Sequence, residues 1–183
     1  MTSFTATERL GTAARTADCA LAERFDRLLR ENGAALNRLA SGYTNTASDR
    51  DDLVQEIALA LWRALPRFRG ECSERTFLFR IAHNRSMTWL AQKRAWVPIP
   101  EDEVVLRDPA PDPEAGFARE ERSRLLFGAI RGLPIGYRQA MMLALEGLDY
   151  GEIGQILGIS ESNAGVRLKR AKELLKKALE GKA

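Results

Sequence analysis

The sequence predicts an all-α protein: two small helical domains joined by a linker, the second a helix-turn-helix (winged-helix-like) domain. Apolar residues recur at three- and four-residue steps in several segments, which is the period of amphipathic helices. Between residues 97 and 116 there are five prolines and six acidic residues. A segment of this composition buries too little apolar surface to offset the conformational entropy that it would lose on ordering. We therefore expect domains at 18–95 and 117–183, with a flexible acidic linker at 96–116.

The composition excludes several classes of protein. The 183 residues are 45% hydrophobic and 29% charged, with a formal net charge of +3, which is typical of a soluble globular chain. Cys19 and Cys72 form no CxxC pair, which favours a reducing compartment. Because neither a secretion signal nor an apolar run of bilayer length is present, we expect a cytoplasmic protein without membrane insertion. The sequence has one histidine and none of the GxSxG, Walker or HExxH patterns. We therefore expect that the protein is not an enzyme and that it binds no cofactor or metal.

The first predicted helix covers Cys19 to Tyr43. Its apolar residues repeat at helical spacing along one face. Gly33 lies in the middle and weakens the helix there, so that a break can occur. Residues 44–48 are polar and typical of a turn.

The second predicted helix runs from Asp49 to about Leu65, where Pro66 ends it. Acidic residues at its start match the positive end of the helix dipole. Its apolar residues extend beyond one face, and a small domain buries only one stripe of such a helix. Either it is a central core helix or the surplus surface is covered by a partner, and the pattern alone favours neither.

The third predicted helix runs from Ser73 to about Arg94 and carries a concentration of basic residues. With the arginines just upstream they form a basic patch, which suits contact with phosphates. A merely solvated basic face is the competing interpretation. The patch consists of Arg63, Arg67, Arg69, Arg75, Arg80, Arg85, Lys93 and Arg94.

Residues 150–178 predict a helix-turn-helix, preceded by two helices that meet between Gly132 and Pro134. Gly154 allows a close helix crossing, Gly158 supplies a left-handed turn residue and Ser160 caps the next helix. An αα-hairpin with a basic exposed face is the alternative. The second helix is expected to bury Ala164, Leu168, Ala171, Leu174 and Leu175 and to present Ser162, Asn163, Val166, Arg167, Lys169 and Arg170 to the major groove.

Three motifs in order resemble one known family. The run from Asp49 to Trp62, DRDDLVQEIALALW, resembles the DxEDLVQExFLxLW segment of bacterial sigma factors. The FRG at Phe68 and the FRIAHN at 79–84 resemble the FRG…YRIAxN segment that follows it. Together with the helix-turn-helix, the chain resembles an extracytoplasmic-function sigma factor over about 18–94 and 117–177.

This resemblance implies that the chain binds core RNA polymerase, recognises −10 and −35 promoter elements and directs transcription initiation. The polymerase partners would be the β′ clamp and the β flap, and an anti-sigma factor is a further expected partner. The polymerase-binding residues would be Asp52, Leu53, Gln55, Glu56, Leu59 and Trp62. An unpaired −10 base would be captured by Arg67, Phe68, Arg69, Gly70, Phe77, Arg80, His83 and Asn84. The outward residues of the helix-turn-helix would bind the −35 duplex.

The chain departs from the family pattern at several positions. Phe77 stands where the family usually has tryptophan, and 163–166 reads NAGV where TVKS is common. No promoter consensus is therefore transferred to this chain. Two other classes remain: a self-sufficient repressor or activator that dimerises on an operator, and an adaptor that binds a protein. Apolar surface left exposed on the helix ending at Trp62 would favour the sigma factor, whereas a sealed helix would indicate a generic DNA-binding protein.

Overall fold

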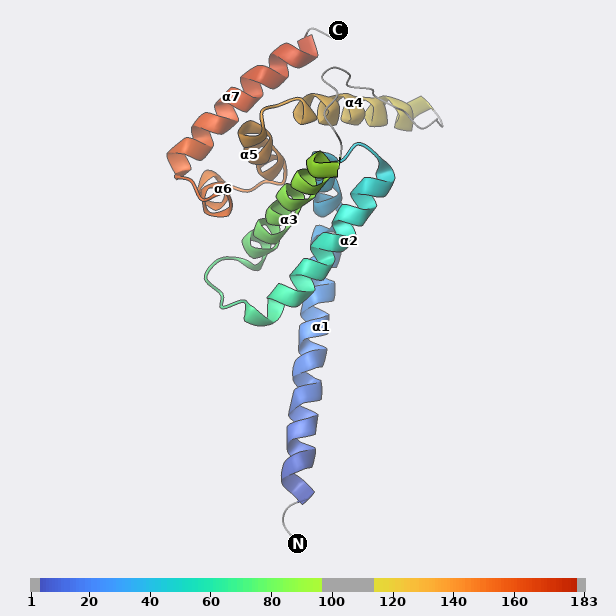
Figure 1. Ribbon diagram of the computed structural model, residues 1–183, viewed down its shortest axis with the longest axis vertical. Helices are drawn as coiled ribbons and strands as arrows, with labels where there is room; N and C mark the ends of the chain where they lie inside the picture. The colour runs from blue at the N-terminus through green and yellow to red at the C-terminus, as the bar shows by residue number, and fades with distance from the viewer. Residues whose placement is uncertain (1–3, 97–113, 181–183) are drawn as a thin grey trace.

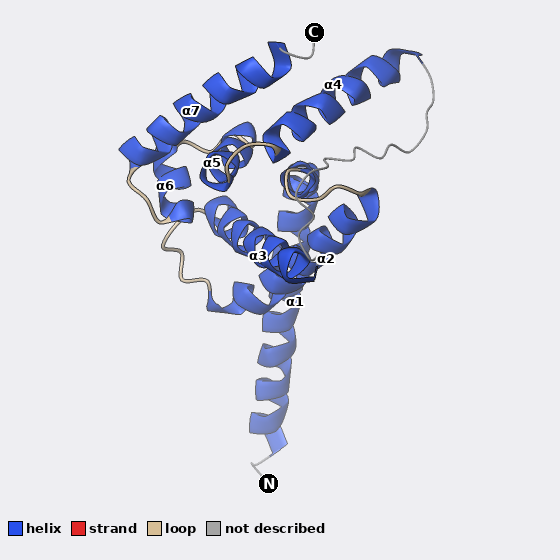
Figure 2. Ribbon diagram, turned by 45° about the horizontal axis from the view of Figure 1, so that its top comes forward, coloured by secondary structure: helices blue, strands red, loops and turns tan. Residues whose placement is uncertain are grey.

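The described part of the chain is entirely helical. The computed structural model describes residues 4–96 and 114–180, with side chains at 19–93 and 121–180. Within these ranges there are helices and turns but no strand, which confirms the predicted fold class (Figure 2). The predicted linker falls mostly on 97–113, outside the described residues. The helices are α1 (Phe4–Ser41), α2 (Ala47–Ala64), α3 (Glu74–Trp96), α4 (Glu114–Arg131), α5 (Ile135–Leu145), α6 (Tyr150–Leu157) and α7 (Glu161–Glu180), with a 3₁₀ turn at Leu65–Arg67.

Helices α1, α2 and α3 form the N-terminal unit. Helix α1 begins well before Cys19 and continues unbroken through Gly33, so the break considered there is absent. Its C-terminal half packs on α2 and α3 and buries Leu28, Leu36 and Leu39, while the rest extends away from the body (Figure 1). Burial of this stripe outweighs the modest helix propensity cost of one glycine.

Capping residues set where α2 and α3 begin. The Thr46 hydroxyl accepts a hydrogen bond from the Asp49 backbone N–H at 3.0 Å, so α2 starts two residues earlier than expected. Ser73 does the same for α3, where its hydroxyl accepts from the Thr76 N–H at 2.9 Å. Pro66 lies in the 3₁₀ turn that follows α2, as its lack of an N–H requires.

Helices α6 and α7 have helix-turn-helix geometry. Gly158 adopts a left-handed φ of 67° after α6, and Ser160 accepts a hydrogen bond from the Asn163 N–H at 3.2 Å. A Cβ on Gly154 would lie 2.8 Å from the Ile159 carbonyl oxygen, so the turn passes directly over this glycine. The expectation that Leu174 is buried is wrong, because 38% of it is exposed.

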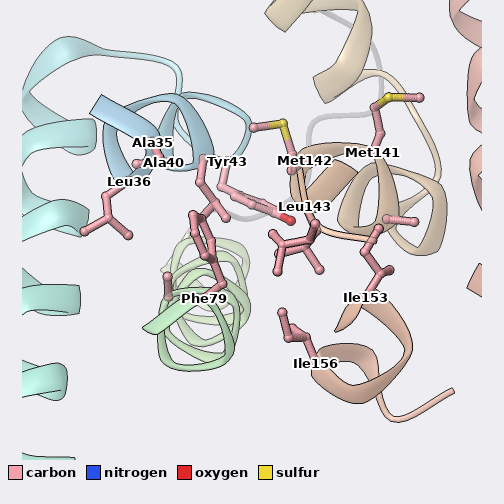
Figure 3. Close-up of a cluster of buried hydrophobic side chains, with 14 of the residues drawn as sticks. Ala35, Leu36, Ala40, Tyr43, Phe79, Met141, Met142, Leu143, Ile153 and Ile156 are labelled. Atoms are coloured by element: carbon pink, nitrogen blue, oxygen red, sulfur yellow. The ribbon is translucent and has the colours of Figure 1, made fainter. Parts of the chain in front are cut away.

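The two units are packed against each other through a shared apolar core. Tyr43 and Phe79 from the N-terminal unit lie beside Met142 and Leu143 from α5 (Figure 3). Helix α3 also contacts α6. Helix α4 begins at Glu114, inside the segment expected to be linker. The sequence indicated two domains but not this contact between them.

We predict that Gly154→Ala destabilises the protein by about 1–3 kcal/mol, because the added methyl overlaps a backbone carbonyl that cannot move independently. Gly33→Ala is the matched control: a Cβ there meets no atom within 4 Å, and loss of unfolded-state entropy should stabilise by up to about 1 kcal/mol. Urea unfolding followed by circular dichroism measures both. Equal stability of the two variants would contradict the close crossing.

Candidate nucleic-acid interface

Helix α2 buries one face and exposes apolar side chains on another. Leu53, Ile57 and Leu61 are completely buried. On the exposed side, Leu59 is 57% and Trp62 is 41% accessible, although α1 and α3 are already in place. The surplus apolar surface identified in the sequence is therefore uncovered, which indicates a binding surface rather than a central core helix.

Polar residues surround this apolar surface. Asp52 and Gln55 are exposed at helical spacing with Leu59, and Glu56 is half-buried. The Glu56 carboxylate lies 3.8 Å from an Arg85 guanidinium nitrogen on α3. The structure corrects one member of the predicted set: Leu53 points into the core and presents no surface to a partner.

A pocket of about 210 Å³ opens between the 3₁₀ turn and the start of α3. The Phe68 and Phe77 rings meet in it with centroids 4.6 Å apart. Aromatic faces next to guanidinium groups are suited to stacking an unpaired base while neutralising its phosphates. The lining residues are Arg67, Phe68, Arg69, Glu71, Cys72, Phe77 and Arg80.

Two arginines from α1 complete the surroundings of this pocket and were not found from the sequence. The Arg24 guanidinium lies over the Phe68 ring, 5.1 Å from its centroid. Arg24 and Arg27 both bind Glu74, at 2.7 and 2.8 Å. Burial acts to raise the pKa of Glu74, but hydrogen bonds from the two arginines bring it below its usual value. The three-residue spacing of Arg24 and Arg27 predicts that they share one face of α1. The sequence around them does not show which loop that face contacts.

His83 does not reach the open part of this interface. It is 7% exposed, and burial lowers the pKa of its ring to about 4. It lies on the same face of α3 as Thr76 and Met87, which contact Glu152 and Gln139 of the C-terminal unit. The predicted contact of His83 with DNA is therefore wrong for this conformation, because the ring is buried. The neighbouring Asn84 is exposed.

The outward face of α7 is polar, basic and accessible. Val166 is 59% exposed, and Ser162, Lys169 and Arg170 are also exposed. The Arg167 Nε donates to the Asn163 side-chain oxygen at 3.1 Å. Tyr150 of α6, missed in the sequence analysis, is 49% exposed beside Gly165, so it borders the same face.

Comparisons with known proteins agree with this arrangement. The model of Sigma-70 region 2 matches residues 28–95, and that of Sigma-70 region 4 matches 123–175. The chain is 30% identical to the ECF RNA polymerase sigma-E factor of Haemophilus influenzae, over 92% of this chain and 98% of the relative. The chain belongs to the ECF sigma factors. It is a promoter-recognising sigma factor that directs transcription initiation.

Solved structures share the fold of this sigma factor. CnrH, solved in complex with the cytosolic domain of CnrY, is 27% identical with a TM-score of 0.66, over 87% of this chain and 89% of that one. The sigma factor RpoE of Bartonella quintana, solved with the anti-sigma factor NepR, is 22% identical with a TM-score of 0.67, over 86% and 98%. None of the helices in the described part of this sigma factor has the length and apolarity needed to cross a bilayer.

The burial of His83 predicts a pH-dependent stability. Because the folded state disfavours the charged ring, the unfolded state binds a proton between the usual pKa of 6.5 and about 4, and stability falls as pH decreases through this window. Lowering the pH from 7.5 to 5 should cost about 2 kcal/mol from this group. Urea unfolding at both pH values measures it. His83→Gln should lose this part of the pH dependence; an unchanged difference would contradict the burial of the ring.

Proposed function

We propose that three exposed surfaces divide the work of transcription initiation. The exposed face of α2 binds the β′ clamp of core RNA polymerase. The pocket at Phe68 takes an unpaired base of the −10 element, and the outward face of α7 reads the −35 duplex. The units at 18–95 and 117–183 then act as separate DNA-binding modules joined by the segment at 96–116.

The exposure of Leu59 and Trp62 is the observation that carries this proposal. Both remain accessible although the opposite face of α2 is fully buried. Large apolar side chains ringed by polar residues are typical of the energetically dominant centre of a protein interface. Trp62 is held edge-on by Phe25, with ring centroids 5.1 Å apart, so little side-chain entropy is lost on binding.

Chemistry supports the two DNA assignments. An unpaired base offers a π-face to Phe68 and Phe77, and the guanidinium groups around the pocket attract its phosphates. On α7, Asn163 and Arg170 carry the donors and acceptors that read base edges, and Val166 can touch a thymine methyl. Arg167, already oriented by Asn163, suits a phosphate.

We further propose that the protein works in the cytoplasm, catalyses no reaction itself and also contacts the β flap. An anti-sigma factor is proposed as its inhibitory partner. The support for this partner is the fold shared with two sigma factors solved in complexes: CnrH with the cytosolic domain of CnrY, and RpoE with the anti-sigma factor NepR.

Leu59→Ser should weaken binding to a β′ clamp fragment by about tenfold, because it removes a central apolar contact. Run-off transcription with core polymerase should fall in parallel. Leu179→Ser is the matched control, since Leu179 is also exposed but lies at the far end of α7. Equal effects of both variants on clamp binding, measured by titration, would refute the α2 assignment.

Phe68→Ala should reduce holoenzyme binding to a promoter fragment with an unpaired −10 strand by about 1–3 kcal/mol, the usual value of one base stacked on an aromatic ring. Binding to a duplex with only the −35 element should not change, because no residue of α7 lines the pocket at Phe68. Competition assays at fixed salt compare the two. Equal losses on both fragments would argue against base capture by this pocket.

A further inference from the structure

We propose that Arg24 and Arg27 of α1 bind a phosphate of the DNA strand next to the base that the pocket at Phe68 captures. Neither arginine belongs to the motifs at 49–62 and 68–84, and neither lines the pocket itself. The ligand is one backbone phosphate of single-stranded DNA, held between two guanidinium groups. This inference rests on the proposed capture of an unpaired base and adds a backbone contact to that site.

Arg24 connects α1 to the aromatic part of the pocket. Its guanidinium carbon lies 5.1 Å from the centroid of the Phe68 ring. Phe68 and Phe77, whose centroids are 4.6 Å apart, line the pocket together. A base that stacks on these rings therefore has a cation of α1 beside it. Because every base is attached to a backbone that carries one phosphate per nucleotide, this cation lies within reach of a phosphate.

Glu74 holds the two arginines side by side. Nε of Arg24 donates to one carboxylate oxygen at 2.7 Å, and a terminal nitrogen of Arg27 donates to the other oxygen at 2.8 Å. Two guanidinium groups that meet at the two oxygens of one anion are also suited to a phosphate, whose oxygens accept hydrogen bonds in the same way. The pair is thus assembled before DNA arrives.

Both guanidinium groups keep donors for a phosphate. A guanidinium carries five N–H donors, and the bonds to Glu74 use only part of them. The side chains of Arg24 and Arg27 are 32% and 49% exposed, so a ligand can reach both from solvent. A phosphate therefore binds without breaking the contact with Glu74.

Two carboxylates offset the charge of this pair. Glu74 binds both arginines, and the Glu31 carboxylate lies 4.0 Å from Arg27. Exposed charges that are already paired have little affinity for a further ion, so the arginines bind DNA weakly by themselves. They contribute once stacking on Phe68 has brought a phosphate to them, since that phosphate is then held at a high local concentration.

Cations border the pocket from two separate parts of the chain. Arg67, Arg69 and Arg80 line it from the 3₁₀ turn, the loop and α3, whereas the pair comes from α1. Proteins that bind single strands combine a positively charged track for the backbone with aromatic rings for the bases. The pair on α1 extends this track past Phe68 and accounts for one defined phosphate.

A carboxylate of the polymerase is the competing ligand for the pair. Phe25 of α1 packs edge-on against Trp62, with ring centroids 5.1 Å apart, so α1 also lies beside the proposed polymerase-binding face of α2. The position of Arg24 over Phe68 favours DNA, because that ring is the one on which the captured base stacks. Binding to core polymerase without DNA is therefore measured alongside binding to DNA.

A neutral linkage in the DNA identifies the phosphate. The probe is a promoter fragment with an unpaired −10 strand, in which one phosphate at a time is replaced by an uncharged methylphosphonate. Holoenzyme with Arg27→Gln should bind the unmodified fragment about threefold more weakly, with a slope of log K against log salt that is smaller by about 0.7. On the fragment that is neutral at the contacted phosphate, Arg27→Gln should cause no further loss. Arg24→Gln should couple to the same linkage.

Arg50→Gln is the matched control. Arg50 also forms an exposed ion pair, with Asp51 at 3.1 Å, at the start of α2. The pocket follows the other end of this 18-residue helix, which is about 27 Å long. Arg50→Gln should leave both the affinity for the fragment and its salt dependence unchanged.

Glu74→Gln tests the sign of the charge effect. Removal of the carboxylate charge leaves an acceptor oxygen for one arginine and increases the attraction for a phosphate, so affinity for the unmodified fragment should rise about threefold at low salt. A purely structural role of the three residues predicts instead that Glu74→Gln and Arg27→Gln both weaken binding. That result would overturn the inference.

Two further results would also overturn it. One is strict additivity of Arg27→Gln with every modified linkage, and the other is weaker binding of Arg27→Gln to core polymerase in the absence of DNA. Phe68→Ala on the same fragments separates these failures from a failure of the proposed function. A loss with Phe68→Ala but no coupling at Arg27 leaves base capture intact, whereas no loss with Phe68→Ala would count against the pocket itself.

Discussion

The structure depends on the packing of one stripe of α2. Leu53, Ile57 and Leu61 fill the space between α1 and α3, and their burial orients the whole helix. Because a three-helix unit covers only one side of α2, Leu59 and Trp62 on the other side stay in water. The force that assembles the N-terminal unit therefore also creates its binding surface.

The pocket shows how distant segments combine into one site. The two phenylalanines come from a loop and from the start of α3, whereas the cation over Phe68 comes from α1. Glu74 holds Arg24 and Arg27 at the pocket and offsets part of their charge. The result is a small aromatic surface with basic residues around it, which is the chemistry that the proposed capture of an unpaired base requires.

The contact between the two units determines how the pocket and the face of α7 are placed relative to each other. The two proposed DNA-binding surfaces, the pocket and the face of α7, are both accessible while the units are packed together. The contacts at Glu146 and Met142 hold the two units together and so set the separation of these surfaces.

The sequence by itself determined the local structure and the class of protein. The turn at Gly158, the cap at Ser160 and the surplus apolar residues of α2 are signals carried by neighbouring positions, and the structure agrees with each of them. Helical periodicity shows which residues share a face, but it does not show what covers that face. The tertiary structure alone decided that His83 is buried and Leu174 exposed, and that Arg24 reaches Phe68. It also decided that the two units share a core, because such long-range packing depends on shape complementarity between surfaces far apart in the chain.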